Sequence, residues 1–143
     1  MTTTDVAPRD RLVALPVRII GAALLAAAGG IHLYLYFNGY RGISIIGPLF
    51  MAHAVSALVL AVAVLVVPGR RLPWVAAAAA LFEAGALGGL VLSLTVGFFG
   101  FIESVQAPLL SWTVAVEVAG FLLFAGYVAL ILLRRGRQRA PAS

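Results

Sequence analysis

The stretch ISIIGPLFMAHAVSALVLAVAVLVV, residues 43–67, contains no charged side chain over a length sufficient to cross a lipid bilayer. A hydrocarbon core of roughly 30 Å requires about 20 helical residues. Three further stretches have the same character: residues 19–37 carry no charge, residues 72–102 carry only Glu83, and residues 104–133 carry only Glu117. None alternates polar and apolar residues as a half-buried strand would. The sequence therefore predicts an all-α fold, an integral membrane four-helix bundle.

The expected helices form a single transmembrane domain covering residues 1–143. Prolines and glycines mark the breaks, because proline costs least near a helix start and Asn-Gly or Pro-Gly pairs favour turns. We expect helices at about 16–37, 45–67, 73–99 and 108–133, with basic tails at 1–15 and 134–143. The connections are short, so consecutive helices should be antiparallel neighbours.

The composition agrees with this interpretation. Of the 143 residues, 63% are hydrophobic and 10% are charged, whereas a soluble domain is about 25% charged. A soluble domain and a disordered chain are both excluded. The sequence has no cysteine, which excludes disulfides, thiol redox chemistry and cysteine metal sites. The net charge of +5 does not indicate nucleic acid as a partner, because the arginines lie between apolar segments.

The positions of the arginines predict the orientation, since arginine and lysine are enriched in cytoplasmic loops. Arg41 lies with Glu103 on one side of the expected bundle, and the other nine arginines lie on the opposite side. We therefore predict a multi-pass protein of the bacterial cytoplasmic (inner) membrane with both termini cytoplasmic. The absence of lysine, beside abundant Ala, Val, Leu and Gly, is typical of a high-GC bacterial genome. The nine arginines are Arg9, Arg11, Arg18, Arg70, Arg71, Arg134, Arg135, Arg137 and Arg139.

Two patterns bear on how the helices are arranged. Prolines open all four expected helices at similar separations, which predicts two repeated helical hairpins, although capping preference alone would also place prolines there. Small residues at 22–30 and the Gly85-x-x-x-Gly89 pair favour close helix packing in lipid. We expect this packing within the bundle, with the bilayer as the main partner. A homo-oligomer or a larger membrane complex is the alternative.

Each expected helix carries one histidine or glutamate, and a charge at the centre of a bilayer is costly. These residues are His32, His53, Glu83 and Glu117. A rise of about 1.5 Å per residue places the two histidines and Glu117 roughly 9–13 Å below the outer surface, with Glu83 just beneath them. The shared depth predicts that His32, His53 and Glu117 converge in the outer half of the bundle. Glu103, in the second outer loop, is expected to be solvated.

Such a group can support several kinds of chemistry. Nitrogen and oxygen donors suit zinc, iron, copper or manganese, so a metal shell of His32, His53 and Glu117, with Glu83 as a further ligand or proton acceptor, is the leading hypothesis. Haem b, with His32 and His53 as axial ligands, is the second. A structural or assembly subunit and a proton-linked transport component are the alternatives. No phosphate-binding glycine loop or nucleophile elbow is present, and no reaction is assigned.

Overall fold

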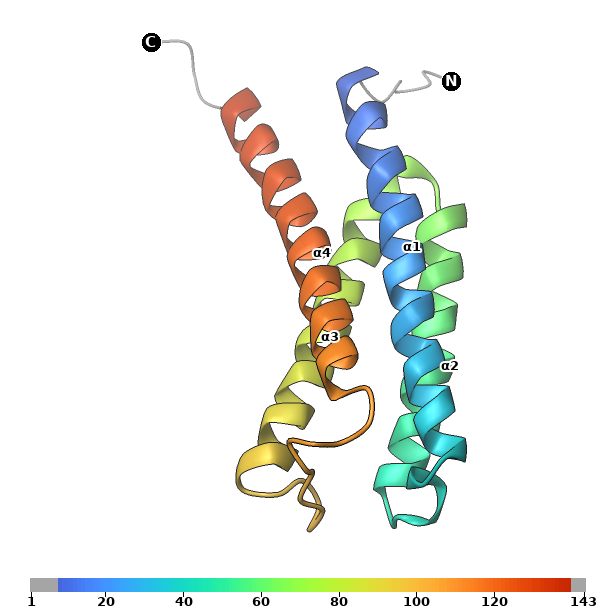
Figure 1. Ribbon diagram of the computed structural model, residues 1–143. Helices are drawn as coiled ribbons and strands as arrows, with labels where there is room; N and C mark the ends of the chain where they lie inside the picture. Colours follow the sequence, from blue (N-terminus) through green and yellow to red (C-terminus); the bar gives the residue numbers. More distant parts are fainter. Residues whose placement is uncertain (1–7, 140–143) are drawn as a thin grey trace.

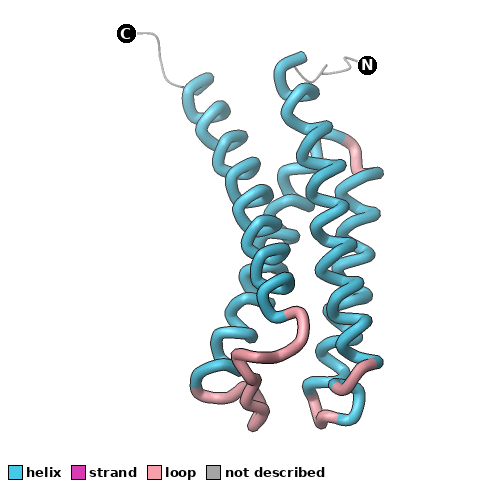
Figure 2. Tube along the Cα trace, in the orientation of Figure 1, coloured by secondary structure: helices cyan, strands magenta, loops and turns pink. Residues whose placement is uncertain are grey.

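Four long helices make up most of the protein. The computed structural model describes residues 8–139, and its helices are α1 (Pro8–Phe37), α2 (Ile46–Val66), α3 (Leu72–Thr95) and α4 (Leu110–Arg139). Short 3-10 turns, η1 (Tyr40–Gly42) and η2 (Gly69–Arg71), lie in the first two connections. The described residues contain no strand, only an isolated bridge between Phe98 and Phe101. The all-α, four-helix prediction is confirmed (Figures 1 and 2).

The helices run up and down, so the bundle has two distinct ends. The start of α1, the turn η2 and the end of α4 lie together at what we call the terminal end (Figure 1). The loops 38–45 and 96–109 lie together at the opposite end, the loop end. This topology agrees with the expected antiparallel hairpins. The assignment of the terminal end to the cytoplasm remains a prediction from the arginine positions.

The helix bounds differ from those expected, mainly at the terminal end. α1 begins at Pro8 and passes through Pro16, and α4 continues to Arg139. Proline is tolerated inside a membrane helix because neighbouring groups satisfy the backbone atoms that it leaves unpaired. Much of both expected tails is therefore helical, and residues 1–7 and 140–143 lie outside the described part. Since Pro16 does not open a helix, it does not support the predicted repeat.

Large apolar side chains are exposed on the surface of the bundle along its helices. All four helices are long and apolar enough to cross a membrane, and large apolar side chains are exposed on every one. A soluble protein rarely exposes a continuous apolar surface beyond a few hundred Å². The arrangement therefore supports a multi-pass membrane protein. Examples of these exposed side chains are Ile19, Ile20, Val59, Val62, Leu81, Val91 and Leu122.

The apolar core lies between the middle of the bundle and the terminal end. There the buried core includes Leu25, Val64, Leu72 and Phe124. The helix α1 packs along α2 and against α4, and α3 packs along α4, whereas α2 and α3 make few direct contacts. The two hairpins are thus joined chiefly through α1 and α4.

Small residues bring α1 and α2 together as expected, but those of α3 have another role. A Cβ atom added at Gly29 would lie 3.1 Å from the Ala54 carbonyl oxygen of α2. A Cβ atom at Gly85 would meet nothing within 4 Å, and one at Gly89 would meet only the Phe98 ring. The prediction that Gly85 and Gly89 pack against another helix of the bundle is therefore wrong. Both glycines instead line the cavity described below.

Arg18 connects the two helices of the first hairpin. Its guanidinium group donates hydrogen bonds to the carbonyl oxygens of Val64, Leu65 and Val67 at distances of 2.5, 2.8 and 2.6 Å. These carbonyls lie at the C-terminal end of α2, where the last four have no partner within the helix. A positive charge there also interacts favourably with the helix dipole. Arg18 therefore caps α2, in addition to any role in setting the orientation.

Candidate metal centre

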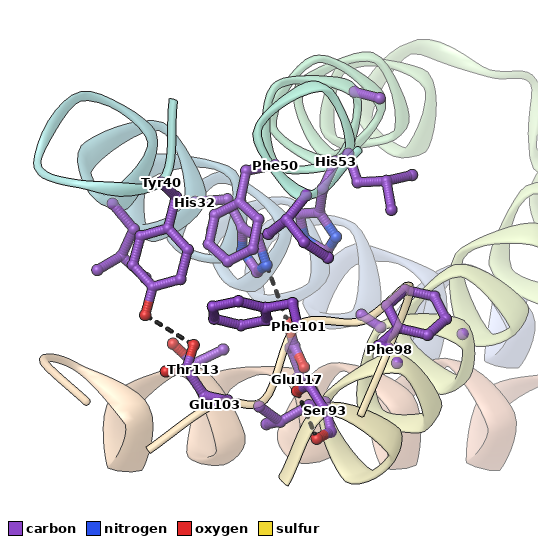
Figure 3. A pocket seen from close by; sticks show the side chains of 18 of the residues that line it. His32, Tyr40, Phe50, His53, Ser93, Phe98, Phe101, Glu103, Thr113 and Glu117 are labelled. Atoms are coloured by element: carbon purple, nitrogen blue, oxygen red, sulfur yellow. Dashed lines mark hydrogen bonds and ion pairs between the residues drawn. The ribbon is translucent and has the colours of Figure 1, made fainter. Parts of the chain in front are cut away.

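Three of the four predicted ionisable residues meet in the half of the bundle nearer the loop end. They are His32 of α1, His53 of α2 and Glu117 of α4, and each offers one ligand atom such that all three atoms lie within 4.8 Å of one another (Figure 3). The prediction that these side chains converge is confirmed. The group joins the two hairpins, because the histidines come from the first and Glu117 comes from the second.

The backbone of α1 orients the imidazole of His32. Its Nδ1 atom lies 3.0 Å from the Ala28 carbonyl oxygen, one turn earlier in the helix. Because a carbonyl oxygen can only accept, Nδ1 carries the proton and donates this hydrogen bond. The Nε2 atom of the neutral ring then has a free lone pair, and it lies 3.8 Å from Glu117 Oε1. Histidine ligands of metals commonly use their second nitrogen in this way.

Stacked rings hold His53 in place. Its ring lies parallel to that of His32, with centroids 3.6 Å apart and an interplanar angle of 18°. The Phe82 ring of α3 also packs against it, at a centroid distance of 4.5 Å. The Nε2 atom of His53 is buried and has no hydrogen-bond partner in the described part of the chain. His53 is thus fixed in orientation while one of its nitrogens stays unpaired.

The two carboxyl groups of the bundle interior are both buried and incompletely paired. Glu117 is 1% exposed and Glu83 is 0% exposed. Within residues 8–139, Oε2 of Glu117 and both oxygens of Glu83 lack a hydrogen-bond partner. Glu83 packs against Gly120, where an added Cβ would lie 3.0 Å from Oε1. Glu83 lies outside the close group of three, so its role as a ligand or proton acceptor stays a prediction.

A cavity of about 470 Å³ extends from the three ligand atoms towards the loop end. Aromatic rings form much of its wall. Tyr40 stacks on Phe50 at 4.5 Å, and Phe50 packs against His32 at 4.9 Å. Together with the His53 and Phe82 contacts, these pairs make a continuous column of rings from the loop end into the bundle. No single segment of sequence predicts this column, although Phe50 lies three residues before His53 and therefore on the same face of α2.

A hydrogen bond joins the two connections at the loop end, beside the cavity. The Tyr40 hydroxyl donates to Glu103 Oε2 at 2.7 Å, and the Ser104 amide donates to Glu103 Oε1 at 2.9 Å (Figure 3). Glu103 was expected to be a solvated loop residue. It is instead half-buried and lines the cavity. Burial and the neighbouring Glu103 carboxylate raise the pKa of Tyr40, so its hydroxyl stays protonated and remains a donor at neutral pH.

Removing the Tyr40 hydroxyl should loosen the loop end. In Tyr40→Phe the ring still stacks on Phe50, but a half-buried carboxylate loses its donor. Hydrogen bonds to charged groups contribute about 1.5–3 kcal/mol, so we expect the free energy of unfolding to fall by about 1–2 kcal/mol. Chemical unfolding in detergent measures this loss. Tyr34→Phe, which alters an exposed tyrosine, is the matched control. Equal stability of both variants would contradict the prediction.

No protein-family model, curated protein or solved structure matches the chain. The chemistry of the site is therefore inferred from its own residues. Two imidazole nitrogens and one carboxylate oxygen are ligands that divalent transition metals accept in proteins. The three atoms lie close enough together for modest side-chain rotations to bring them around one ion, since metal–ligand bonds are about 2 Å long.

Proposed function

We propose that this protein binds a divalent transition metal ion through His32, His53 and Glu117 in the bacterial cytoplasmic membrane, with both termini in the cytoplasm. Two imidazoles and one carboxylate form the ligand set of many zinc and non-haem iron sites with an open coordination position. The three side chains line the cavity, so an ion that they held would have space beside it for a further ligand. An ion held in this way polarises an oxygen atom that binds to it, as a Lewis acid does.

The unpaired buried atoms are the observation that supports this proposal. Native proteins pair the large majority of their buried polar groups, and leaving one unpaired costs about 1–3 kcal/mol. If these residues only held the bundle together, their side chains would satisfy one another. His53 Nε2 and Glu117 Oε2 are instead buried without a partner in the described residues. A bound cation would satisfy both, which favours a ligand site over a purely structural network.

The stacking of the two histidines favours an ion over haem b. In bis-histidine ligation the imidazoles approach the iron from opposite faces of the porphyrin. Ring centroids 3.6 Å apart leave no room for a porphyrin between the two rings. An ion at the edges of the two rings requires no gap of that size, because the rings have only to tilt out of the stack for their in-plane lone pairs to converge on it.

Proton-linked transport has less support than metal binding. A proton path needs polar groups along the bundle. Beyond Glu83, the described core towards the terminal end consists of apolar side chains and Tyr127, with Leu25, Val64 and Phe124 fully buried. Glu83 therefore lies at the inner end of the buried polar residues, next to an apolar core.

Titration of metal-free protein in detergent with Co²⁺ tests the proposal. The visible absorption of Co²⁺ reports nitrogen and oxygen ligands, and we expect one ion to bind per chain. Glu117→Gln should weaken binding by more than about 10-fold, because even loss of a group that merely orients a ligand costs about 10–100-fold in affinity. Glu103→Gln makes the same change in another carboxylate that lines the cavity, and it should bind as wild type does. Wild-type protein that binds neither Co²⁺ nor Zn²⁺ would refute the metal site.

A further inference from the structure

The cavity has the features of a binding site for a small organic molecule. Such sites have volumes of about 300–1,000 Å³, apolar and aromatic walls, and a few polar groups that orient the ligand. This cavity measures about 470 Å³. Aromatic side chains from three parts of the chain line it: Phe50 of α2, Phe82 of α3, and Phe98 and Phe101 of the second outer loop. Aromatic rings bind other rings well, in offset or edge-to-face geometry.

The free polar atoms gather at one end of this cavity. Ser93 and Thr113 also line it, but their hydroxyl groups donate to carbonyl oxygens of Leu90 and Leu109. The Tyr40 hydroxyl is bound to Glu103. Among the described residues that line the cavity, the buried side-chain atoms without a partner are those of His53 and Glu117. A ligand would therefore find one polar anchor at the inner end and a largely apolar wall elsewhere.

The cavity opens sideways between α2 and α3. The described residues that both line it and are exposed include Ala52 and Ser56 of α2 and Leu81 and Gly85 of α3. Leu81 is 75% exposed. These residues lie near the middle of helices that are long enough to cross a membrane, so the opening faces the hydrocarbon. Towards the loop end, Tyr40, Phe101 and Glu103 line the cavity and are half-buried, and the Tyr40 hydroxyl is bound to Glu103 (Figure 3). Leu49 and Pro108 are the exposed lining residues nearer that end.

We propose that the cavity binds a membrane-soluble phenol, with an aromatic and alkyl body, that enters from the bilayer between α2 and α3. The body lies against the aromatic wall, and the hydroxyl group points to His53 and Glu117. The proposal deepens the proposed function: with an ion in place, the phenol oxygen takes the open coordination position. Without an ion, the hydroxyl donates to the unpaired Nε2 of His53, so the two proposals can fail separately.

The opening can be blocked with one substitution that has a close control. Gly85 lines the cavity and Gly88 does not, and both are exposed positions of α3. An added Cβ at either position meets nothing within 4 Å, so a side chain can begin at each without a clash. We expect wild-type protein and Gly88→Phe to bind radiolabelled 4-octylphenol saturably, one per chain. Gly85→Phe should bind it at least 10-fold more weakly while retaining Co²⁺ binding.

Two further measurements separate the parts of the proposal. Octylbenzene has the same body without the hydroxyl group, and it should compete poorly with 4-octylphenol. In the Co²⁺-loaded protein, 4-octylphenol should shift the visible absorption of the ion. If Co²⁺ does not bind but 4-octylphenol still binds and Gly85→Phe blocks it, the phenol site stands and the metal site fails.

Three results would overturn the phenol site. One is the absence of saturable 4-octylphenol binding to wild-type protein. Another is equal binding by Gly85→Phe and Gly88→Phe. The third is a wild-type dimer in detergent that Gly85→Phe converts to a monomer, since a second copy of the chain would then cover the opening.

Discussion

Replacing both His32 and His53 with glutamine is expected to abolish the binding of Co²⁺ and Zn²⁺. Loss of a partner that merely orients a ligand costs about 10–100-fold in metal affinity, so loss of two ligands should cost more than about 1,000-fold. Glu117 alone would then be left as a ligand. Metal analysis after equilibrium dialysis and the Co²⁺ absorption spectrum both measure this effect.

The bundle itself should survive this change. Glutamine keeps a polar group at each position, and hydrogen bonds between membrane helices average only about 0.6 kcal/mol. Circular dichroism should therefore show unchanged helicity. Ser56→Gln is the matched control, because it places glutamine on the cavity wall one turn from His53 without removing a ligand. Full metal binding by the double histidine variant would exclude the imidazoles as ligands.

The largest loss of stability is expected at Arg18. Replacing it with methionine keeps an unbranched chain in α1 but removes three hydrogen bonds to α2. A hydrogen bond from an ionised donor contributes about 1.5–3 kcal/mol. Because the guanidinium group is half-buried and water can replace part of its contacts, we expect the free energy of unfolding to fall by about 2–3 kcal/mol in total.

Unfolding of the Arg18→Met variant by denaturant in detergent micelles measures this loss. Arg70→Met removes an exposed arginine of the turn η2 at the same end of the bundle, and it should change stability little. Arg18→Lys keeps the charge but not the planar group that reaches several carbonyls, so its loss should be intermediate. Equal stability of the Arg18 and Arg70 methionine variants would show that the cap contributes nothing.

The number of helices could be predicted from each segment of sequence by itself. The meeting of three side chains could be predicted from the depth of each residue within its own segment. A crossing needs about 20 uncharged residues, and this signal lies within one segment. Depth follows from the rise per residue, which was sufficient to place His32, His53 and Glu117 at one level. The same count places Glu83 just beneath these three residues, and in the structure Glu83 lies outside their close group.

The remaining features depend on contacts between distant segments. The partners Tyr40 and Glu103 are 63 residues apart, and no local pattern identifies such a pair. Gly85 and Gly89 have the spacing of a packing surface, but α2 and α3 make few contacts, so the glycines face a cavity. The start of α1 was misplaced because proline usually marks a helix start in water. A membrane helix accommodates Pro16 in its interior.

His32 and His53 belong to one hairpin and Glu117 belongs to the other. An ion bound by all three residues would therefore link the two hairpins. A ligand that binds only the assembled form stabilises that form by mass action, by about 2.7 kcal/mol when its free concentration is 100 times its dissociation constant. The association of the two hairpins would then vary with the supply of free metal in the cell. Without the ion, the two hairpins would be held together mainly by the contacts between α1 and α4. This form of the protein would be degraded more easily than the form with the ion bound.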